Sequence, residues 1–289
     1  DDSFFYRFNI WFDKHITPNK GRIKIDKYQQ ITINKVLNEF KKEDRATIAM
    51  ACGSGKTLVS FWITEALKPK FIVVFLPSKA LLKQIREEWL SQDYANGLLE
   101  NISVFSEKEY TEYDEQSLGI TDSTFRVLNS KEKIKKFLRQ KSNNTKVVFC
   151  TYQSSPLLSK SLPSNFSFDF GVFDEAHKTT SNKILKNKSK QKFSWNMPLQ
   201  DSFIKIKKRL FMTATLKTSN YSKQNKLGYE QIVYSMTNEK QYGKIVDNFT
   251  FVKARKAMVI CPIKVVVSIV TNDELHFKNI SKTAVNIEN

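Results

Sequence analysis

The sequence predicts an α/β protein in which a parallel β-sheet is flanked by helices on both faces. Short apolar runs rich in β-branched and aromatic residues alternate with segments of helical periodicity, which is typical of parallel sheets. The runs are nearly continuous in apolar residues, as expected for strands that are buried on both faces. The chain has 289 residues, enough for one large domain or for one domain and part of another.

The expected strands are the short apolar runs themselves. They comprise Ala46–Ala51, Phe71–Leu76, Ile102–Phe105, Val147–Thr151, Phe168–Phe173 and Leu210–Thr213. Each is bounded by polar or turn-forming residues, and each has the length of a buried strand. Together they predict the central sheet.

Three helices are expected between these strands. Thr57–Leu67 directly follows a glycine-rich turn, whereas Lys79–Leu90 and Lys131–Arg139 place apolar residues on one face at helical spacing. Asn129 lies three residues before Glu132, so we expect it to cap the last of these helices.

Composition excludes several classes of protein. Hydrophobic residues make up 40% and charged residues 26%, which rules out wholesale disorder. No run reaches the roughly 18 apolar residues of a membrane span, and the N-terminus lacks the pattern of a signal peptide. Cys52, Cys150 and Cys261 are too few and too far apart for a disulfide framework or a CxxC metal site. We therefore expect a cytoplasmic protein with no membrane partner.

The net charge of +18 favours a polyanionic partner, and nucleic acid before a membrane surface. Most of the 47 basic residues are lysines, however, and an AT-rich genome would give the same excess. Charge alone does not decide between these explanations.

A glycine-rich turn between a strand and a helix predicts a phosphate-binding loop. It consists of Cys52, Gly53, Ser54, Gly55, Lys56 and Thr57. Backbone N–H groups and the helix N-terminus can wrap a triphosphate, with Lys56 on the β and γ phosphates and the Thr57 hydroxyl on Mg²⁺. Met50 stands where the strict motif has Gly or Ala, so a glycine turn that happens to precede Lys-Thr is the alternative.

An acidic pair follows the strand Phe168–Phe173, at the end where parallel sheets bind their ligands. Asp174 suits a water-mediated contact to Mg²⁺, and Glu175 suits the positioning of an attacking water. Alone, such a pair also fits a solvated turn, but the phosphate loop upstream favours the catalytic interpretation. Thr213 and Thr215, after the last strand, can hydrogen-bond a neighbouring carboxylate or histidine, although alone they also fit ordinary strand residues.

As a set, the phosphate loop, the DEAH sequence Asp174–His177 and the TAT sequence Thr213–Thr215 resemble the first motor domain of superfamily-two helicases and translocases. The resemblance is closest to the motors of type I, type III and ISP-like restriction enzymes, because Tyr28 and Gln29 lie upstream of the loop. It implies a RecA-like P-loop NTPase domain that binds ATP and Mg²⁺ and acts on DNA in preference to RNA.

The resemblance also implies roles for further residues. Gln29 would read adenine, and His177 with Thr213 and Thr215 would couple the nucleotide state to the nucleic-acid track. The residues implied to contact nucleic-acid phosphates are Ser78, Lys79, Thr151, Tyr152 and Gln153.

Three parts of the chain are expected. Residues 1–22 form an N-terminal extension or the end of an upstream domain, 23–220 form the first motor lobe, and 221–289 hold a linker and the start of a truncated second lobe. The aromatic cluster of residues 1–20 would pack on the main domain or stack on bases, and the lysine-rich stretch 178–192 is a solvated loop or a DNA contact.

The second RecA-like domain that such motors require is expected to be absent from this chain, because only Arg255 supplies an arginine after residue 220. The isolated residues are therefore expected to bind nucleotide, to hydrolyse it weakly and not to unwind a duplex. The full-length protein would then add the second lobe and a nuclease or methyltransferase module. Its setting would be the bacterial cytoplasm, or the host cytoplasm for a virus or plasmid protein.

Two rival functions remain at this point. One is a non-catalytic NTP-binding module that binds nucleic acid or acts as a scaffold, and the other is a P-loop kinase or transport ATPase. Neither accounts for DEAH and TAT together. Stimulation of ATP hydrolysis by DNA would separate a motor from a scaffold, whereas salt-dependent DNA binding would not.

Overall fold

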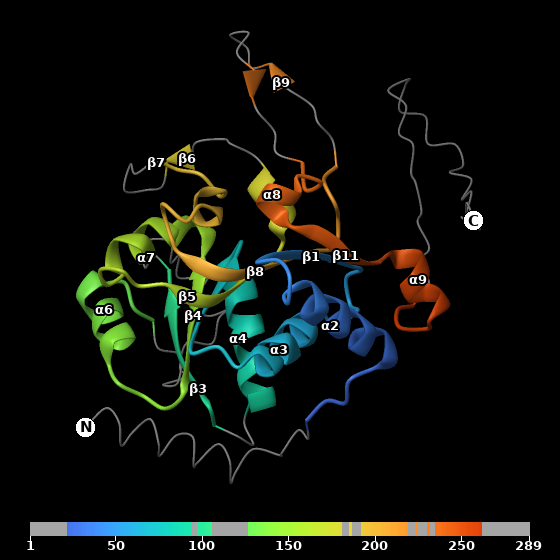
Figure 1. Cartoon of the computed structure of the whole chain (residues 1–289), viewed down its shortest axis with the longest axis horizontal. Coiled ribbons are helices and arrows are strands. Elements are labelled where there is room, and N and C mark those ends of the chain that lie inside the picture. Colours follow the sequence, from blue (N-terminus) through green and yellow to red (C-terminus); the bar gives the residue numbers. More distant parts are fainter. Residues whose placement is uncertain are drawn as a thin grey trace, which may run out of the picture.

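The computed structural model describes residues 22–93, 97–105, 127–180, 185–186, 192–218, 223–224, 230–231 and 235–261. Its centre is a seven-stranded sheet with the order β11-β1-β8-β5-β2-β4-β3, in which every neighbouring pair is parallel (Figure 1). The α/β fold class predicted from the sequence is thereby confirmed.

All six expected strands are present in this sheet. The strands are β1 (Arg45–Met50), β2 (Phe71–Leu76), β3 (Leu99–Val104), β4 (Thr145–Thr151), β5 (Phe168–Phe173), β8 (Ile206–Thr213) and β11 (Lys244–Phe249). Of these, β11 is not expected from the sequence, because it is a half-exposed edge strand without an apolar run. Among the described residues, β6 (Leu185–Lys186) pairs with β7 (Lys192–Phe193), and β9 (Lys223–Gln224) pairs with β10 (Glu230–Gln231).

The three expected helices are present as well. The α-helices are α2 (Lys27–Glu39), α3 (Lys56–Leu67), α4 (Lys79–Asp93), α6 (Lys131–Arg139), α7 (Ser155–Ser161), α8 (Glu239–Tyr242) and α9 (Phe251–Lys256). Short 3₁₀ turns are η2 (Tyr152–Ser154), η3 (Ala176–Thr180) and η4 (Met197–Leu199). The expected cap at Asn129 is wrong by one residue. Ser130 holds the N-cap position of α6, and its hydroxyl donates to Glu132 Oε2 at 2.6 Å.

The two faces of the sheet carry two separate hydrophobic cores. Strand β2 shows the division, since Ile72 and Val74 point into one core while Val73 and Phe75 point into the other. Helices α2, α3 and α4 cover the first core, and α6 and α7 cover the second. Burial on both faces explains why the strands read as continuous apolar runs.

The sheet continues past residue 220, where the sequence places the end of the first motor lobe. Strand β11 pairs with β1, and the Phe249 carbonyl accepts from the Ala51 N–H at 3.0 Å. Asp247 on β11 also accepts from Lys35 Nζ at 2.6 Å and from the Thr32 hydroxyl on α2. Residues 244–249 therefore belong to the same sheet as β1, the strand that leads into the phosphate loop.

The turn into β11 requires a glycine at position 243. Gly243 has φ 67° and ψ −177°, a combination that residues with a side chain hardly adopt. A Cβ there would lie 2.2 Å from the Arg45 carbonyl oxygen, which belongs to the neighbouring strand. The two backbones can approach this closely only because residue 243 has no side chain.

We expect Gly243→Ala to lower the free energy of unfolding by about 3 kcal/mol, through backbone strain and the clash with Arg45. Gly97→Ala is the matched control, because Gly97 also has a positive φ of 58° but nothing lies within 4 Å of its Cβ position. The control should cost only about 1 kcal/mol. Urea denaturation measures both, and equal losses would contradict the close approach.

Several expectations fall outside the described residues, among them the aromatic cluster of residues 1–20. The lysine-rich stretch 178–192 is described only in part. Within the ranges given above, no helix has both the length and the apolar character needed to cross a membrane.

Candidate active site

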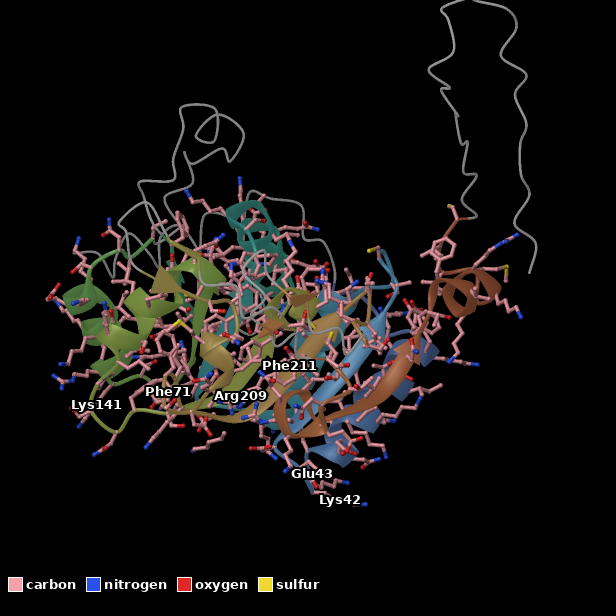
Figure 2. The ribbon with its side chains drawn as sticks, turned by 90° about the horizontal axis from the view of Figure 1, so that it is seen from above. Lys42, Glu43, Phe71, Lys141, Arg209 and Phe211 are labelled. Carbon is pink, nitrogen blue, oxygen red and sulfur yellow. The ribbon has the colours of Figure 1, made fainter. Side chains whose placement is uncertain are left out.

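Three strands bring the sequence motifs to one edge of the sheet. β8 lies between β1 and β5, all three are parallel, and each is followed directly by one of the motifs. In Figure 2, Lys42, Glu43 and Phe71 mark the rim where β1 and β2 begin, so the motifs lie at the opposite rim. The carboxyl ends of parallel strands are the usual ligand-binding edge of such a sheet.

The phosphate loop has the backbone conformation that its glycines allow. Gly53 and Gly55 have φ values of 78° and 77°, and Gly55 is the N-cap of α3. A Cβ on Gly55 would lie 2.5 Å from Gln29 Nε2. The buried Ser54 hydroxyl donates to the Ala51 carbonyl at 2.6 Å, which closes the turn. Cys52 and Gly53 are exposed, so this side of the loop is open to a ligand.

Lys56 begins α3 and folds back over the loop. Its ammonium donates to the carbonyls of Met50 at 3.1 Å and Ala51 at 3.3 Å. Burial and Glu175 raise the pKa of Asp174, and the Lys56 charge opposes that rise; at Glu175 the His177 hydrogen bond is the main cause of a lowered pKa, and Lys56 adds to it. The charge of Lys56 therefore acts on both carboxylates of the acidic pair.

Asp174 is held rigidly at the end of β5. Its N–H donates to the Phe75 carbonyl at 3.0 Å, and its own carbonyl accepts from the Tyr152 hydroxyl at 2.9 Å. Burial, with Glu175 as a second cause, raises the pKa of the Asp174 carboxyl to about 6. Ionising a buried carboxylate that has no partner costs free energy. The Asp174 carboxylate is therefore suited to bind a cation.

Oxygen donors that fit magnesium are present beside the loop. Mg²⁺ is usually held by one or two protein oxygens together with phosphate oxygens and water. The hydroxyl of Thr57 and the carboxylate of Asp174 match that donor set. In the described part of the chain, no group of three or more His, Cys, Asp and Glu residues is suited to hold a metal alone.

A chain of polar contacts joins the acidic pair to the third motif. His177 Nδ1 lies 3.1 Å from Glu175 Oε2 and 2.9 Å from Thr213 Oγ1. The Thr213 hydroxyl donates to the Thr215 carbonyl at 2.9 Å and accepts from the Thr215 N–H at 3.0 Å. The Thr213 hydroxyl donates its one hydrogen to Thr215, and the Glu175 carboxylate only accepts. Nδ1 of His177 must therefore carry the proton that both contacts need.

The contact with His177 also favours the ionised form of the Glu175 carboxyl. The hydrogen bond from His177 is the main cause that holds the pKa of the Glu175 carboxyl below its usual range. Glu175 has a positive φ of 49°, uncommon for a residue with a side chain. Such backbone strain is often found at functional sites.

Gln29 lies against the phosphate loop, as its sequence position suggests. Its Oε1 accepts from the Asp26 N–H at 2.9 Å, and its Nε2 donates to the Ser54 carbonyl at 3.4 Å. The adjacent Tyr28 hydroxyl donates to the same carbonyl at 2.9 Å. The proposed contact of Gln29 with adenine stays a prediction.

The residues implied to contact nucleic acid lie at or just after the ends of the neighbouring strands β2 and β4 and differ in their exposure. Ser78 is exposed, Gln153 is half-buried, and the Lys79 ammonium lies 5.4 Å from the centre of the Phe105 ring. The assignment of Thr151 and Tyr152 as phosphate contacts stays a prediction, although both side chains are buried. The burial of Tyr152 comes from packing, because its ring stacks between Phe75 and Trp195.

We expect Tyr152→Phe to lower the free energy of unfolding by about 1 kcal/mol, because the Asp174 carbonyl loses its donor. DNA affinity should be unchanged. Chemical denaturation and a DNA-binding titration check both. A variant of normal stability with tenfold weaker DNA binding would show that the Tyr152 hydroxyl contacts DNA.

Two residues near the loop were missed by the sequence reasoning. The Phe249 ring stacks on Tyr28 with centroids 4.6 Å apart, and Ile260 lies 3.6 Å from the Cβ position of Gly53. Both come from the segment that starts with β11. No local pattern marks them, since their places depend on the pairing of β11 with β1.

Comparisons with known proteins identify one family and several relatives. The family described as "Type III restriction enzyme, res subunit" matches residues 22–218. The "Probable helicase A859L" of African swine fever virus (isolate Pig/Kenya/KEN-50/1950) is 27% identical over 192 residues, which are 65% of this chain and 19% of the relative. The protein of the Tick/Malawi isolate is 26% identical over 191 residues, with the same coverage.

Two solved structures of type ISP restriction-modification enzymes resemble this chain. LlaBIII bound to DNA has a TM-score of 0.65 and 27% identity, over 83% of this chain and 16% of that one. A nuclease-deletion mutant of LlaGI with a DNA substrate mimic has a TM-score of 0.63 and 25% identity, over 82% and 21%. The chain thus spans about a fifth of the length of these relatives.

Proposed function

Because the chain belongs to the type III restriction enzyme res subunit family, we propose that it is the ATP-binding motor lobe of a DNA helicase or translocase. The observation that carries the proposal is the contact chain from Glu175 through His177 to Thr213, at the sheet edge that holds the phosphate loop. A motor needs such a connection between its nucleotide and the rest of the lobe. DNA is favoured as the track because the similar LlaBIII structure is described as bound to DNA.

Several residues of this chain would bind ATP and take part in its hydrolysis. The N–H groups at the start of α3 and the Lys56 ammonium would bind the phosphates. Thr57 and Asp174 would hold Mg²⁺, which supplies charge neutralisation at the β and γ phosphates when it is bound. Glu175 would orient the attacking water and accept its proton, and Gln29 would read the adenine.

His177 would transmit a change at the nucleotide site to the third motif. Its Nδ1–H lies within reach of both Glu175 and Thr213, so a change in the position of Glu175 alters the contact with the third motif. Thr213 and Thr215 would pass that change on. The Ser78 end of α4 is the exposed point at which we expect nucleic acid to bind.

The test is the rate of ATP hydrolysis with and without duplex DNA. We expect DNA to stimulate hydrolysis by the full protein, and the 289-residue chain alone to bind ATP but turn it over slowly. The second RecA-like lobe, a nuclease or methyltransferase module and cytoplasmic residence remain part of the proposal. Nucleotide binding without any DNA-stimulated turnover in the full protein would favour the scaffolding alternative.

A further inference from the structure

The turn that carries Glu175 is held by hydrogen bonds on both sides of that residue. On one side, the Asp174 carbonyl accepts from the Tyr152 hydroxyl at 2.9 Å. On the other side, the Ala176 carbonyl accepts from the Thr179 hydroxyl at 2.7 Å. Glu175 itself has a positive φ of 49°, and such a conformation persists only where the surrounding structure enforces it. The two carbonyl contacts are therefore suited to fix the Glu175 backbone.

Tyr242 extends the contact on the Ala176 side, although none of the motifs includes it. Its hydroxyl lies 3.0 Å from the Thr179 hydroxyl. A threonine hydroxyl has one hydrogen, and Thr179 donates it to the Ala176 carbonyl, so Tyr242 is the donor in the second bond. Two hydrogen bonds in series thus run from Tyr242 through Thr179 to the peptide that joins Ala176 and His177.

Tyr242 also contacts the strands that carry the other two motifs. Its carbonyl accepts from the Thr47 hydroxyl of β1 at 2.7 Å, and its ring packs edge-on against Phe211 of β8, with centroids 5.2 Å apart. Strand β1 leads into the phosphate loop, β8 leads into the third motif, and Thr179 lies in η3, after β5. One residue therefore touches the elements of all three motifs.

The hydroxyl of Tyr242 does more than packing requires. The side chain is fully buried, and its ring would make the same contact with Phe211 if it were a phenylalanine. A buried hydroxyl is costly unless it is hydrogen-bonded, and this one is bonded to Thr179. The ring can thus account for the packing, while the hydroxyl supplies a directed bond toward the Glu175 turn.

We propose that Tyr242 is a positioning residue that holds Glu175 in place through Thr179 and the Ala176 carbonyl. The inference rests on the proposed function, because that function gives Glu175 its role toward the attacking water. It goes beyond the recognised motifs, none of which includes residue 242.

The experiment measures kcat and KM for ATP hydrolysis by the full protein with saturating duplex DNA. Tyr242→Phe keeps the ring and removes the hydroxyl, and Thr179→Val removes the link to Ala176. Each should lower kcat about tenfold and leave KM for ATP nearly unchanged, because Glu175 is misplaced while the phosphate contacts persist. The double variant should lose no more than Thr179→Val alone, since both residues act through one series of bonds.

Thr145→Val is the matched control. Thr145 is half-buried at the start of β4, at the opposite edge of the sheet, and its hydroxyl donates to the Pro69 carbonyl at 2.9 Å. Loss of that hydroxyl should leave kcat unchanged. Thr179→Ser keeps the hydroxyl of residue 179, so its kcat should match wild type.

Tyr242→Phe and Thr179→Val variants with the kcat of the control would overturn the inference and leave the proposed function standing. If thermal melting shows that Tyr242→Phe does not fold, equal kcat values for Thr179→Val and Thr179→Ser overturn it instead. A wild-type protein whose ATP hydrolysis is not stimulated by duplex DNA would count against the proposed function itself.

Discussion

Lys56→Ala is expected to weaken ATP binding by about 100-fold or more. The Lys56 ammonium sits over the phosphate loop, bonded to the carbonyls of Met50 and Ala51, where it can transfer those hydrogen bonds to phosphate oxygens. Each hydrogen bond between charged groups contributes about 1.5–3 kcal/mol, and the ammonium can make more than one. Binding of a fluorescent ATP analogue to the 289-residue chain measures the loss.

Lys70→Ala is the control for this variant. It removes the same charge at the opposite edge of the sheet, where Lys70 precedes β2 and its ammonium donates to the Ser142 carbonyl at 2.8 Å. Its ATP affinity should equal that of wild type. Equal affinities for the Lys56 and Lys70 variants would mean that general positive charge, and not the loop, attracts the nucleotide.

Glu175→Gln is expected to retain ATP binding and to lose turnover by about 10²–10⁴-fold in the full protein, because glutamine cannot accept the proton of the attacking water. The amide oxygen of glutamine still accepts from His177 Nδ1, so the link to Thr213 should survive. Steady-state ATP hydrolysis with duplex DNA, together with the binding assay, separates the two effects.

Glu132→Gln on α6 is a suitable comparison, because Glu132 is an exposed carboxylate outside the site. It should leave both binding and turnover unchanged. Normal hydrolysis by the Glu175 variant would refute its role as the base, while loss of binding would show that it holds the nucleotide instead.

Much of the fold follows from local sequence. The runs Phe71–Leu76 and Phe168–Phe173 are strands with the predicted bounds, because strands buried on both faces are apolar at nearly every position; the half-buried Asp169 is the exception. The phosphate loop can also be predicted from local sequence. Gly53 and Gly55 mark backbone conformations that other residues rarely adopt, and those conformations depend on neighbours along the chain.

Other features depend on residues that are distant in sequence. Strand β11 has no apolar run, because an edge strand is half-exposed, and it was found only through its pairing with β1. Tyr152 packs between Phe75 and Trp195, and its hydroxyl supports Asp174. Its burial is set by neighbours that the local sequence does not name.

The parallel α/β sheet, the phosphate loop and the order of the motifs can be predicted from local sequence, because backbone conformation and burial periodicity act over a few neighbouring residues. The contact chain of Glu175, His177 and Thr213, and the bond from Trp89 to the Thr57 carbonyl, could be seen only in the folded structure. Those contacts join separate strands and helices. They exist only once the two cores have packed the helices onto the sheet.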